Sequence, residues 1–375
     1  MPVIARRGDL LEKGQGRAGA HAKGMTPGGL GPAGVDEAIH GIRGDRSMSW
    51  FDTSIMARKG VARGQAGTRH RHSIEDQGKF HYVYGPYADP VLEVDPGAVV
   101  EVETHDAFEG RIRKETDRPT EILQFPYLNP QSGPIFVRGA EKGDALAVRI
   151  LSIRPRGPQP VGTTCLIPEF GGLVGTGDTA MLNPPLPEKV RKVNVDEQWV
   201  YWSDTLRLPY EPFIGTIGTA PEIEAISSLQ PDYFGGNMDT PDVAPGAIIY
   251  LPVNKAGGYL YLGDCHAIQG DGELCGVALE MPAIVELQID LIKGHGNRWP
   301  QLETEHTMGF IGSARPLEDA ARIAYRELVR WVAAETGQSQ EDAYMLLTMC
   351  GKVRLGNMVD PKYSIGASIE KRYLK

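Results

Sequence analysis

The sequence contains few cysteines and no long apolar run. Its four cysteines, among 375 residues, form neither a CxxC pair nor the spacing of a structural zinc site. No segment approaches the roughly 18 to 20 consecutive apolar residues that cross a membrane, and the first residues lack the apolar core of a signal peptide. We therefore expect free thiols in a cytoplasmic protein that has no membrane partner.

Signatures of nucleophilic and nucleotide-dependent chemistry are also missing. The sequence has no Gly-x-Ser-x-Gly elbow, no Ser-Ser-Lys array and no Rossmann or P-loop glycine fingerprint. Cys265 is a poor candidate nucleophile, because on a strand its side chain points away from those of Asp264 and His266. The simplest remaining chemistry is hydrolysis by a water molecule that a carboxylate or a metal activates.

The charge distribution argues against a nucleic-acid partner. Residues 1–72 contain 12 Lys and Arg against 6 Asp and Glu, a charge of about +6, so the remainder carries about −15 of the total of −9. An acidic body repels a phosphate backbone. The basic segment also lacks the interleaved aromatic residues of a single-strand binder.

Composition divides the chain into an arm and a body. Residues 1–75 are rich in Gly, Arg and Ala and show no sustained apolar period, which predicts an arm that is either disordered or wrapped around a neighbouring subunit. The run Arg69–His72 within it is interpreted as a solvated basic patch. Residues 76–375 form the predicted folded body, because β-formers and Pro-Gly turns dominate from Phe80 onward.

The body is predicted to be mainly β with a small helical part near its C-terminus. Residues 81–112 and 132–153 are each interpreted as strand, turn and strand, the second as a hairpin-like pair. Residues 283–292 alternate apolar and polar side chains, as a half-exposed strand does. After Pro316 the apolar spacing becomes helical, Gly337 ends that helix, and Ser339 begins a second one.

Acidic, amide and imidazole side chains concentrate in residues 235–280. Asp264 and His266 stand two residues apart, so on a regular strand they share one face, about 7 Å apart. That spacing suits two ligands of one metal, and zinc accepts both imidazole and carboxylate. Asp106 and Glu280, each beside another apolar run, are the candidates for further ligands. A histidine satisfied within the structure is the alternative interpretation.

Two glycine-rich loops accompany this pair. In QGDGE, residues 269–273, two glycines flank Asp271 and let the backbone turn sharply, so that polar side chains converge. In GGNMD, residues 235–239, paired glycines allow close approach beside Asn237 and Asp239. One such loop is an ordinary polar turn, but two of them beside the Asp-x-His pair favour a functional site.

Ordered blocks across the chain also resemble a known family. They are VDPGAVVEVETHDAFEGRI, SGPIFVRGAEKGDALAVRI, PFIGTIGTAP, GGNMD, LPV, GD-x-H-x-x-QGDGE, the Glu280 of ALEMP, and VRLGNMVDP. Together these blocks, spread over residues 81–374, resemble the acetamidase/formamidase family. The segment 1–75 has no counterpart in that resemblance, and HDAF differs from the commonest form of its block.

The resemblance implies a β-sandwich or barrel fold with a small C-terminal helical part, in a homo-oligomer, dimer or tetramer, that hydrolyses small amides to a carboxylate and ammonia or an amine. It also implies a divalent metal, zinc or alternatively calcium. The residues carried over are Asp106, Asp264, His266 and Glu280 as metal ligands, Asn237, Asp239 and Gln269 in the substrate pocket, and Glu273 and Asp271 as catalytic carboxylates. The implied mechanism activates water at the metal and returns its proton to the leaving nitrogen.

Two alternatives remain open at this point. One is a hydrolase of a bulkier C–N bond, in an anilide, carbamate or urea. The long Pro/Gly-rich passage of residues 157–187 and the residues Tyr82, Tyr84 and Tyr233 are the candidate walls of such a larger pocket. The other is a non-catalytic binding protein in which calcium stabilises the acid-rich turn, since calcium prefers oxygen ligands.

Overall fold

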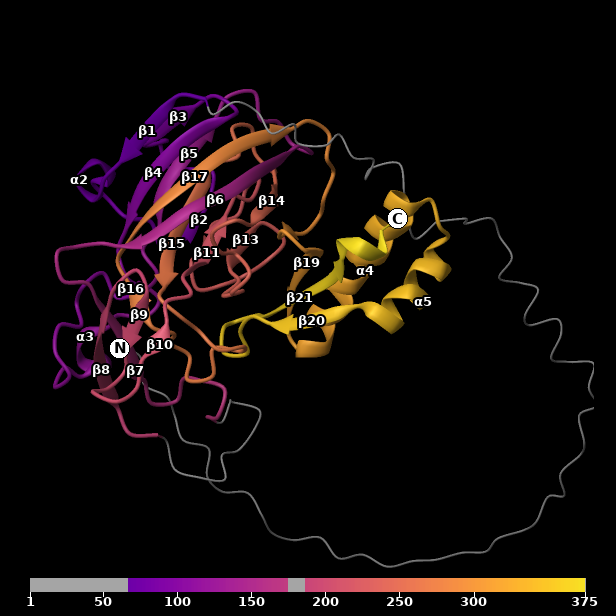
Figure 1. Ribbon diagram of the computed structural model, residues 1–375. Coiled ribbons are helices and arrows are strands. Elements are labelled where there is room, and N and C mark those ends of the chain that lie inside the picture. The colour runs from indigo at the N-terminus through magenta and orange to yellow at the C-terminus, as the bar shows by residue number, and fades with distance from the viewer. Residues whose placement is uncertain (1–66, 175–185, 375) are drawn as a thin grey trace, which may run out of the picture. The chain divides into compact units, whose positions relative to one another are not determined.

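Two β-sheets packed face to face make up most of the protein, which was analysed as a computed structural model (Figure 1). The structure describes residues 67–174 and 186–374, all within one unit that spans residues 51–375. Helices cover a separate part of the fold. This arrangement confirms the predicted mainly β sandwich.

Among the described residues, the first sheet has nine strands. Their order across the sheet is β1 (Arg69–His72), β4 (Ala98–Thr104), β17 (Ala283–Ile292), β6 (Ala145–Pro155), β14 (Ile248–Pro252), β18 (Gln301–Glu303), β19 (Thr307–Ala314), β21 (Tyr363–Glu370) and β20 (Lys352–Leu355). Strand β17 shows the predicted alternation, because Val285, Leu287 and Ile289 are buried and the intervening residues are half-buried.

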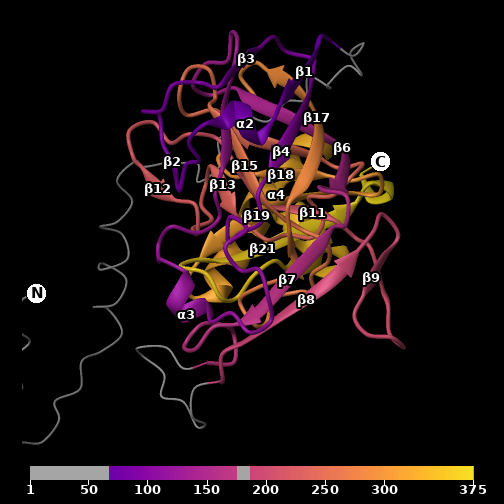
Figure 2. The same cartoon turned by 90° about the vertical axis from the view of Figure 1, so that its left-hand side faces the viewer.

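The second sheet has ten strands in the described part of the chain. Eight of them lie in the order β10 (Leu208–Pro209), β9 (Trp199–Tyr201), β8 (Lys189–Val195), β7 (Val161–Leu166), β16 (Glu280–Met281), β15 (Leu260–His266), β11 (Phe213–Gly218) and β13 (Gly235–Asn237). β5 (Ser132–Val137) also pairs with β15, and β3 (Leu92–Val94) pairs with β5. β7 and β8 run side by side (Figure 2). β2 (Val83–Tyr84) and β12 (Ile226–Ser227) form a separate two-stranded sheet.

The main hydrophobic core fills the space between the two large sheets. Leu146, Val148 and Leu287 contribute to it from the nine-stranded sheet, and Ile214 and Leu262 from the ten-stranded sheet. Because side chains alternate along each strand, the face of the ten-stranded sheet turned away from this core is available for polar groups. The candidate functional residues come mainly from that sheet and its connecting loops.

The helical part packs against β19 and β21. α4 (Leu317–Thr336) follows Pro316 and ends at Gly337, whose φ of 70° favours glycine, while α5 (Gln340–Cys350) begins at Ser339, whose side chain accepts from the Asp342 amide. These boundaries confirm the two helices predicted after Pro316 and from Ser339. The remaining helices are short: α2 (Ile74–Gln77), α3 (Pro119–Ile122) and the 3₁₀ turn η2 (Lys371–Tyr373). Within the described residues, no helix is long and apolar enough to cross a membrane.

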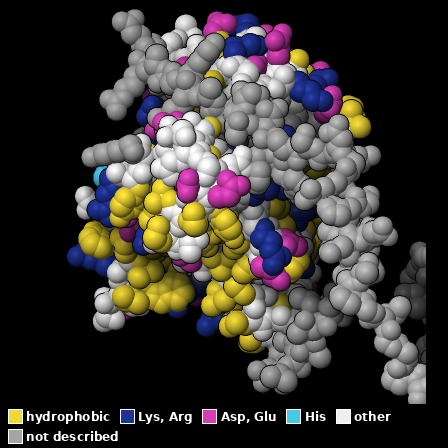
Figure 3. Space-filling view, turned by 90° about the vertical axis from the view of Figure 1, so that its right-hand side faces the viewer, with side chains coloured by type: hydrophobic (Ala, Val, Ile, Leu, Met, Phe, Trp, Pro, Cys, Tyr) yellow, Lys and Arg dark blue, Asp and Glu magenta, His cyan; other side chains and the backbone are white. Residues whose placement is uncertain are grey.

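α5 presents apolar side chains to solvent. Tyr344, Met345 and Met349 are all exposed, Met349 by 79%. Figure 3, viewed from the side of the helical part, shows apolar side chains gathered on this face. Exposed apolar surfaces of this kind are typical of contact sites between proteins. The homo-oligomer implied by the resemblance remains a prediction.

The two predicted strand–turn–strand units form strands, but these strands do not pair with one another. β3 pairs with β5 in one sheet, whereas β4 pairs with β1 and β17 in the other. Likewise β5 joins the ten-stranded sheet and β6 the nine-stranded sheet, so the hairpin-like pair predicted for residues 132–153 was wrong. In both places the turn carries the chain from one sheet of the sandwich to the other.

Part of the predicted arm belongs to the sheet. Arg69–His72 form β1, parallel to β4, and the Arg69 and Arg71 guanidinium groups pair with Glu286 and Glu103 respectively, at 2.7 and 2.8 Å. The basic patch is therefore an edge strand whose arginines face acidic residues of its neighbours. The prediction for the rest of the arm, residues 1–66, lies outside the described residues.

Candidate active site

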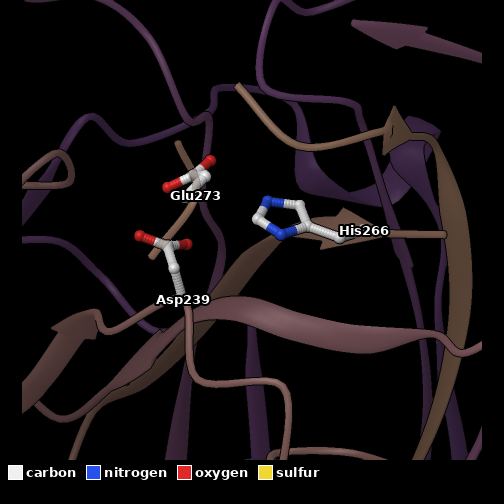
Figure 4. A group of neighbouring side chains, drawn as sticks. All are labelled: Asp239, His266 and Glu273. Carbon is white, nitrogen blue, oxygen red and sulfur yellow. The ribbon is translucent and has the colours of Figure 1, made fainter. Parts of the chain in front are cut away.

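Two groups of possible metal ligands share His266, the last residue of β15. One consists of Asp264, His266 and Glu280, the other of Asp239, His266 and Glu273, and in each group the candidate ligand atoms lie within 4.8 Å of one another. All five side chains are buried. Figure 4 shows Asp239, His266 and Glu273 pointing toward one another. The structure thus brings together residues from two strands and two loops of the ten-stranded sheet.

β15 places Asp264 and His266 on one side, as expected, but not by regular alternation. Leu262 and Cys265 both face the core, although they are three residues apart. The break between them occurs at Asp264, whose φ of 54° is unusual for a residue other than glycine. His266 Nε2 lies 3.5 Å from Asp264 Oδ1. Cys265 is fully buried in the core, and burial raises the pKa of its thiol to about 12, which makes it unsuitable as a nucleophile.

Gln269 fixes which nitrogen of His266 faces the acids. Its amide nitrogen donates to the carbonyl oxygens of Asp239 and Gly356, at 2.9 and 3.0 Å, so its oxygen is left to accept from His266 Nδ1 at 2.9 Å. Nδ1 therefore carries hydrogen, and the neutral ring presents the Nε2 lone pair on its other side. Metal-binding histidines are commonly oriented in this way by a partner at the second nitrogen.

Each carboxylate that faces His266 Nε2 has one oxygen that accepts a hydrogen bond and one that accepts none. Asp264 Oδ2 accepts from Asn129 Nδ2 at 2.8 Å and from Thr216 Oγ1 at 2.9 Å. Glu280 Oε1 accepts from the Ala278 amide at 2.9 Å. The other oxygens, Asp264 Oδ1 and Glu280 Oε2, point at His266. Hydrogen bonds thus orient both groups and leave one ligand atom on each.

A further layer of polar residues supports the second carboxylate pair. Asn357 Nδ2 lies 3.2 Å from Asp239 Oδ2 and 3.1 Å from the Asn237 carbonyl oxygen. The Asn237 side chain accepts from Asn129 Nδ2 and donates to Asp360 Oδ2, at 3.1 and 2.7 Å. Because both ends of its amide are used within the protein, Asn237 positions the surrounding carboxyl groups.

The site contains several buried carboxyl groups, and the residues around them do not supply enough positive charge to neutralise all of them. Burial and nearby carboxylates, Glu273 above all, raise the pKa of Asp239 well above its usual value. Burial likewise raises the pKa of Glu280 well above its usual value, that of Glu273 to about 8 and that of Asp360 to about 7. Among the described residues, no Lys or Arg lines the cavity beside these acids.

His266 and Asp264 behave differently because they face each other. Burial disfavours the imidazolium form, but the carboxylates of Glu280 and Asp264 outweigh it and raise the pKa of His266 well above its usual value. Burial also acts against an ionised Asp264, yet His266 holds the pKa of this carboxyl below its ordinary value. A positive charge is therefore strongly favoured between these groups.

The buried atoms that lack a hydrogen bond identify where that positive charge belongs. Asp239 Oδ1, Asp264 Oδ1, His266 Nε2 and Glu280 Oε2 are all buried and have no hydrogen-bond partner. Nε2 is nevertheless only 3.2 Å from Glu280 Oε2. A lone pair facing carboxylate oxygens at this distance is unfavourable unless a proton or a metal ion lies between them. One imidazole nitrogen and two carboxylate oxygens also match the ligand types of a divalent metal.

A small cavity lies directly beside these groups. It has a volume of about 30 Å³, and its polar lining residues are Asn129, Asn237, Asp264, Glu273, Glu280 and Asp360. Its apolar lining residues are Ala107, Phe108, Phe125, Leu128, Ile167, Phe170, Leu229 and Val277. Neither Asp239 nor His266 lines this space in the described structure. Of the two groups, the one with Asp264 and Glu280 therefore contributes two residues to the cavity lining, and the one with Asp239 contributes only Glu273.

Two of the predicted site residues are not brought into the cluster. Asp106 uses Oδ1 to accept from the amides of Phe108 and Gly110, at 3.1 and 2.7 Å, and so closes the turn after β4. Asp271 is exposed, and its carboxylate pairs with Arg354 at 2.9 Å outside the cluster. The other seven predicted residues lie in or directly behind the cluster.

Several residues of the site were missed by sequence reasoning. Asn129, Thr216, Asn357 and Asp360 all contact the cluster through the hydrogen bonds described above. Thr216 lies within PFIGTIGTAP, and Asn357 and Asp360 lie within VRLGNMVDP, two blocks that carry the family resemblance. These two blocks could therefore have identified Thr216, Asn357 and Asp360 as site residues from the sequence. The side chain of Asn129, within YLNPQ, had no comparable signal.

Comparison with known proteins decides the family. The sequence matches the acetamidase/formamidase family over residues 68–230 and 223–366, which include all five side chains of the two metal-binding groups. The chain belongs to the acetamidase/formamidase family. It is therefore a family enzyme that hydrolyses amides, and the interpretation as a non-catalytic calcium-binding protein is no longer needed.

Relatives of this family are similar over most of the chain. The acetamidase of Mycolicibacterium smegmatis is 27% identical over 363 residues, covering 81% of this chain and 87% of that protein. The crystal structure of an acetamidase from Yersinia enterocolitica has 55% sequence identity and a TM-score of 0.82, covering 88% of this chain and 100% of the other. An acetamidase structure from Bacillus halodurans is 34% identical, with a TM-score of 0.74, and covers 81% and 98%.

Gly215 on β11 provides a test of how closely this family site is packed. A Cβ at this position would lie 2.7 Å from Asp239 Oδ1 and 2.8 Å from both His266 Cε1 and the Asp264 carbonyl oxygen. We expect Gly215→Ala to displace these groups and to reduce kcat/KM for acetamide by about 100-fold, as a misplacement of roughly 1 Å in an active site can do.

The matched control for this substitution is Gly270→Ala, because a Cβ at Gly270 would meet nothing within 4 Å. Both variants should be compared by steady-state kinetics and thermal unfolding. Equal activity of the two variants would show that the cluster tolerates the extra methyl group, contrary to the expectation.

Proposed function

We propose that this enzyme hydrolyses short aliphatic amides with the help of a divalent metal ion held by Asp264, His266 and Glu280. The observation that carries the proposal is the convergence of three buried ligand atoms, each without a hydrogen bond, beside the small cavity. The relatives are an acetamidase and a formamidase, which supports short amides as substrates.

The donor set favours zinc over calcium. Zinc commonly binds three protein ligands that include imidazole and carboxylate, whereas calcium takes six to eight oxygen ligands. Here one ligand is an imidazole nitrogen, which Gln269 orients, and further oxygens of Asp264 and Glu280 are already occupied by hydrogen bonds. When bound, the ion would polarise the amide carbonyl and lower the pKa of water in the cavity.

Glu273 is the proposed proton carrier. It lines the cavity, and its Oε1 accepts from the Ala278 amide at 3.2 Å, which holds the carboxyl in place. Burial raises its pKa to about 8, close to the value that allows a group both to accept and to release a proton near neutrality. Glu273 would take the proton from the attacking water and deliver it to the amide nitrogen, which leaves as ammonia or an amine.

Asn237 and Asp360, which line the cavity, and Asp239, which lies behind it, are proposed to maintain this arrangement. Asp239 has one oxygen toward Asn357, and Asn237 bridges Asn129 and Asp360. Such buried polar networks fix the positions of the groups that perform chemistry. Asp239, His266 and Glu273 form the second possible metal group, which the experiments on Glu273 below distinguish from the first.

Metal removal tests the proposed function directly. Purified protein should be incubated with a chelator, dialysed, and assayed for ammonia release from formamide and acetamide before and after return of zinc or calcium. We expect chelation to reduce turnover at least tenfold and zinc to restore it, because the ligand set contains imidazole nitrogen. Metal content should be measured in parallel.

The contradicting outcome of this test is equally clear. Full turnover of a short amide by protein that contains no metal would refute the metal's role, while leaving amide hydrolysis itself in place. Restoration by calcium alone would retain a metal but assign it to oxygen ligands.

A further inference from the structure

Phe170 lies between the catalytic cavity and a much larger apolar groove. The groove has a volume of about 570 Å³, and Trp202, Ile268 and Leu274 contribute to its walls. Phe170, Glu273 and Val277 line both the groove and the 30 Å³ cavity. Val277 is buried within an apolar cluster, and Phe170 packs against that cluster while it stays half-buried. Glu273 is the proposed proton carrier, so Phe170 is the shared side chain best placed to separate the two spaces.

The local backbone holds the Phe170 ring in this position. The Phe170 amide donates to the Ile167 carbonyl at 3.1 Å, and the Gly172 amide donates to the Leu274 carbonyl at 2.8 Å, which ties this loop to the segment that carries Glu273. The ring lies directly on Gly276, where a Cβ would approach it to 2.5 Å. Its other neighbour is Phe125, in an edge-on arrangement with ring centroids 6.2 Å apart.

The two kinds of lining residue suggest how an amide is oriented at the cavity. The polar lining residues Asp264, Glu273 and Glu280 suit the carbonyl oxygen and the departing nitrogen. The apolar lining residues, which include Phe170, suit the hydrocarbon part of the acyl group. A volume of about 30 Å³ is small, so only a very short acyl group fits beside these residues. A longer acyl chain would have to extend past Phe170 toward the groove.

We propose that Phe170 determines acyl-chain specificity by closing the catalytic cavity against the apolar groove. This inference rests on the proposed function. In the wild-type enzyme the ring stops the acyl group after a very short chain. Removing the ring joins cavity and groove, and the walls formed by Trp202, Ile268 and Leu274 then receive a longer chain.

The experiment compares kcat/KM for acetamide, butyramide, hexanamide and an anilide of acetic acid in wild-type enzyme, Phe170→Ala, Phe170→Leu and Leu173→Ala. Leu173 is the matched control, because its exposed side chain lines the groove but not the cavity. We expect wild type to prefer acetamide over hexanamide at least 100-fold, and Phe170→Ala to reduce this preference at least tenfold, within the range that pocket methylenes discriminate. Phe170→Leu should have a smaller effect, and Leu173→Ala should change the ratio less than threefold.

The outcomes separate this inference from the proposed function. If wild type hydrolyses acetamide but Phe170→Ala and Phe170→Leu leave the hexanamide-to-acetamide ratio unchanged, the inference is wrong and the proposed function stands. An equal change in Leu173→Ala would also overturn it, because the apolar groove would then affect the preference without removal of the Phe170 ring. Gain of anilide rather than hexanamide turnover would assign the groove to the amine side and contradict the acyl orientation. Absence of any amide turnover by wild type would refute both.

Discussion

Replacement of His266 by alanine is expected to reduce kcat/KM for acetamide at least 1000-fold and to remove the bound metal. His266 is the residue shared by both possible metal groups, and its Nε2 is the only nitrogen among their ligand atoms. Its loss also leaves the facing oxygens of Asp264 and Glu280 without the group that attracts them. Metal content by elemental analysis and ammonia release by steady-state kinetics measure the two effects separately.

His295 offers a matched control for this substitution. It is a partly buried histidine that follows β17 of the nine-stranded sheet. Its ring stacks on Tyr250, with ring centroids 5.6 Å apart, and is hydrogen-bonded to Gln301 at 2.9 Å. His295→Ala should keep its metal content and most of its activity, although its unfolding temperature should fall. If His266→Ala retained both full metal content and full activity, the metal site proposed here would be incorrect.

Replacement of Glu273 by glutamine is expected to reduce kcat at least 100-fold while metal content stays unchanged. Glutamine keeps the shape of the side chain and accepts from the Ala278 amide, but it does not carry a proton between water and the leaving nitrogen. General acid–base groups typically contribute a factor of about 100 to 10,000. A fall in kcat at nearly constant KM is the expected signature of an interaction needed in the transition state.

Asp271→Asn is the control for Glu273→Gln, because Asp271 lies two residues away and its exposed carboxylate pairs with Arg354 instead of entering the cluster. It should retain nearly full activity. Loss of metal in Glu273→Gln would show that Glu273 is a ligand, and the ion would then be assigned to the group with Asp239 and His266. Loss of activity in Asp271→Asn alone would reverse the roles of the two carboxylates.

Much of the site was predictable because its central residues are close in sequence and lie on neighbouring strands. Asp264 and His266 share one strand, and Glu280 is paired directly opposite His266 in β16. The family blocks identified the same residues. Asp106 and Asp271 were also proposed from these blocks, but their local turns direct one carboxylate to backbone amides and the other to an arginine. Sequence spacing does not reveal whether a carboxylate binds a nearby amide or arginine instead of entering the site.

The strand pairing was less predictable than the strands themselves. β5 and β6 are adjacent in sequence, and a short turn between two β-forming runs normally favours a hairpin. In the structure β5 pairs with β15, and β6 with β17 and β14, because the chain crosses between the layers of the sandwich. Asn129, just before β5, and Asp360, between β20 and β21, also reach the site through contacts with residues far away in sequence. Residues brought together by tertiary pairing leave no local pattern to recognise.

The pairing of strands that are far apart in sequence also has a consequence for how the enzyme folds. β4 lies between β1 and β17, and the cluster around His266 receives hydrogen bonds from Asn129 and from Asn357 near the other end of the chain. Contacts between residues so distant in sequence require large loops to close, and folding slows as such contacts come to dominate. The catalytic centre is therefore complete only when the segment between β20 and β21 contributes Asn357. We expect its formation to depend on contacts between segments far apart in sequence, which local turns alone do not provide.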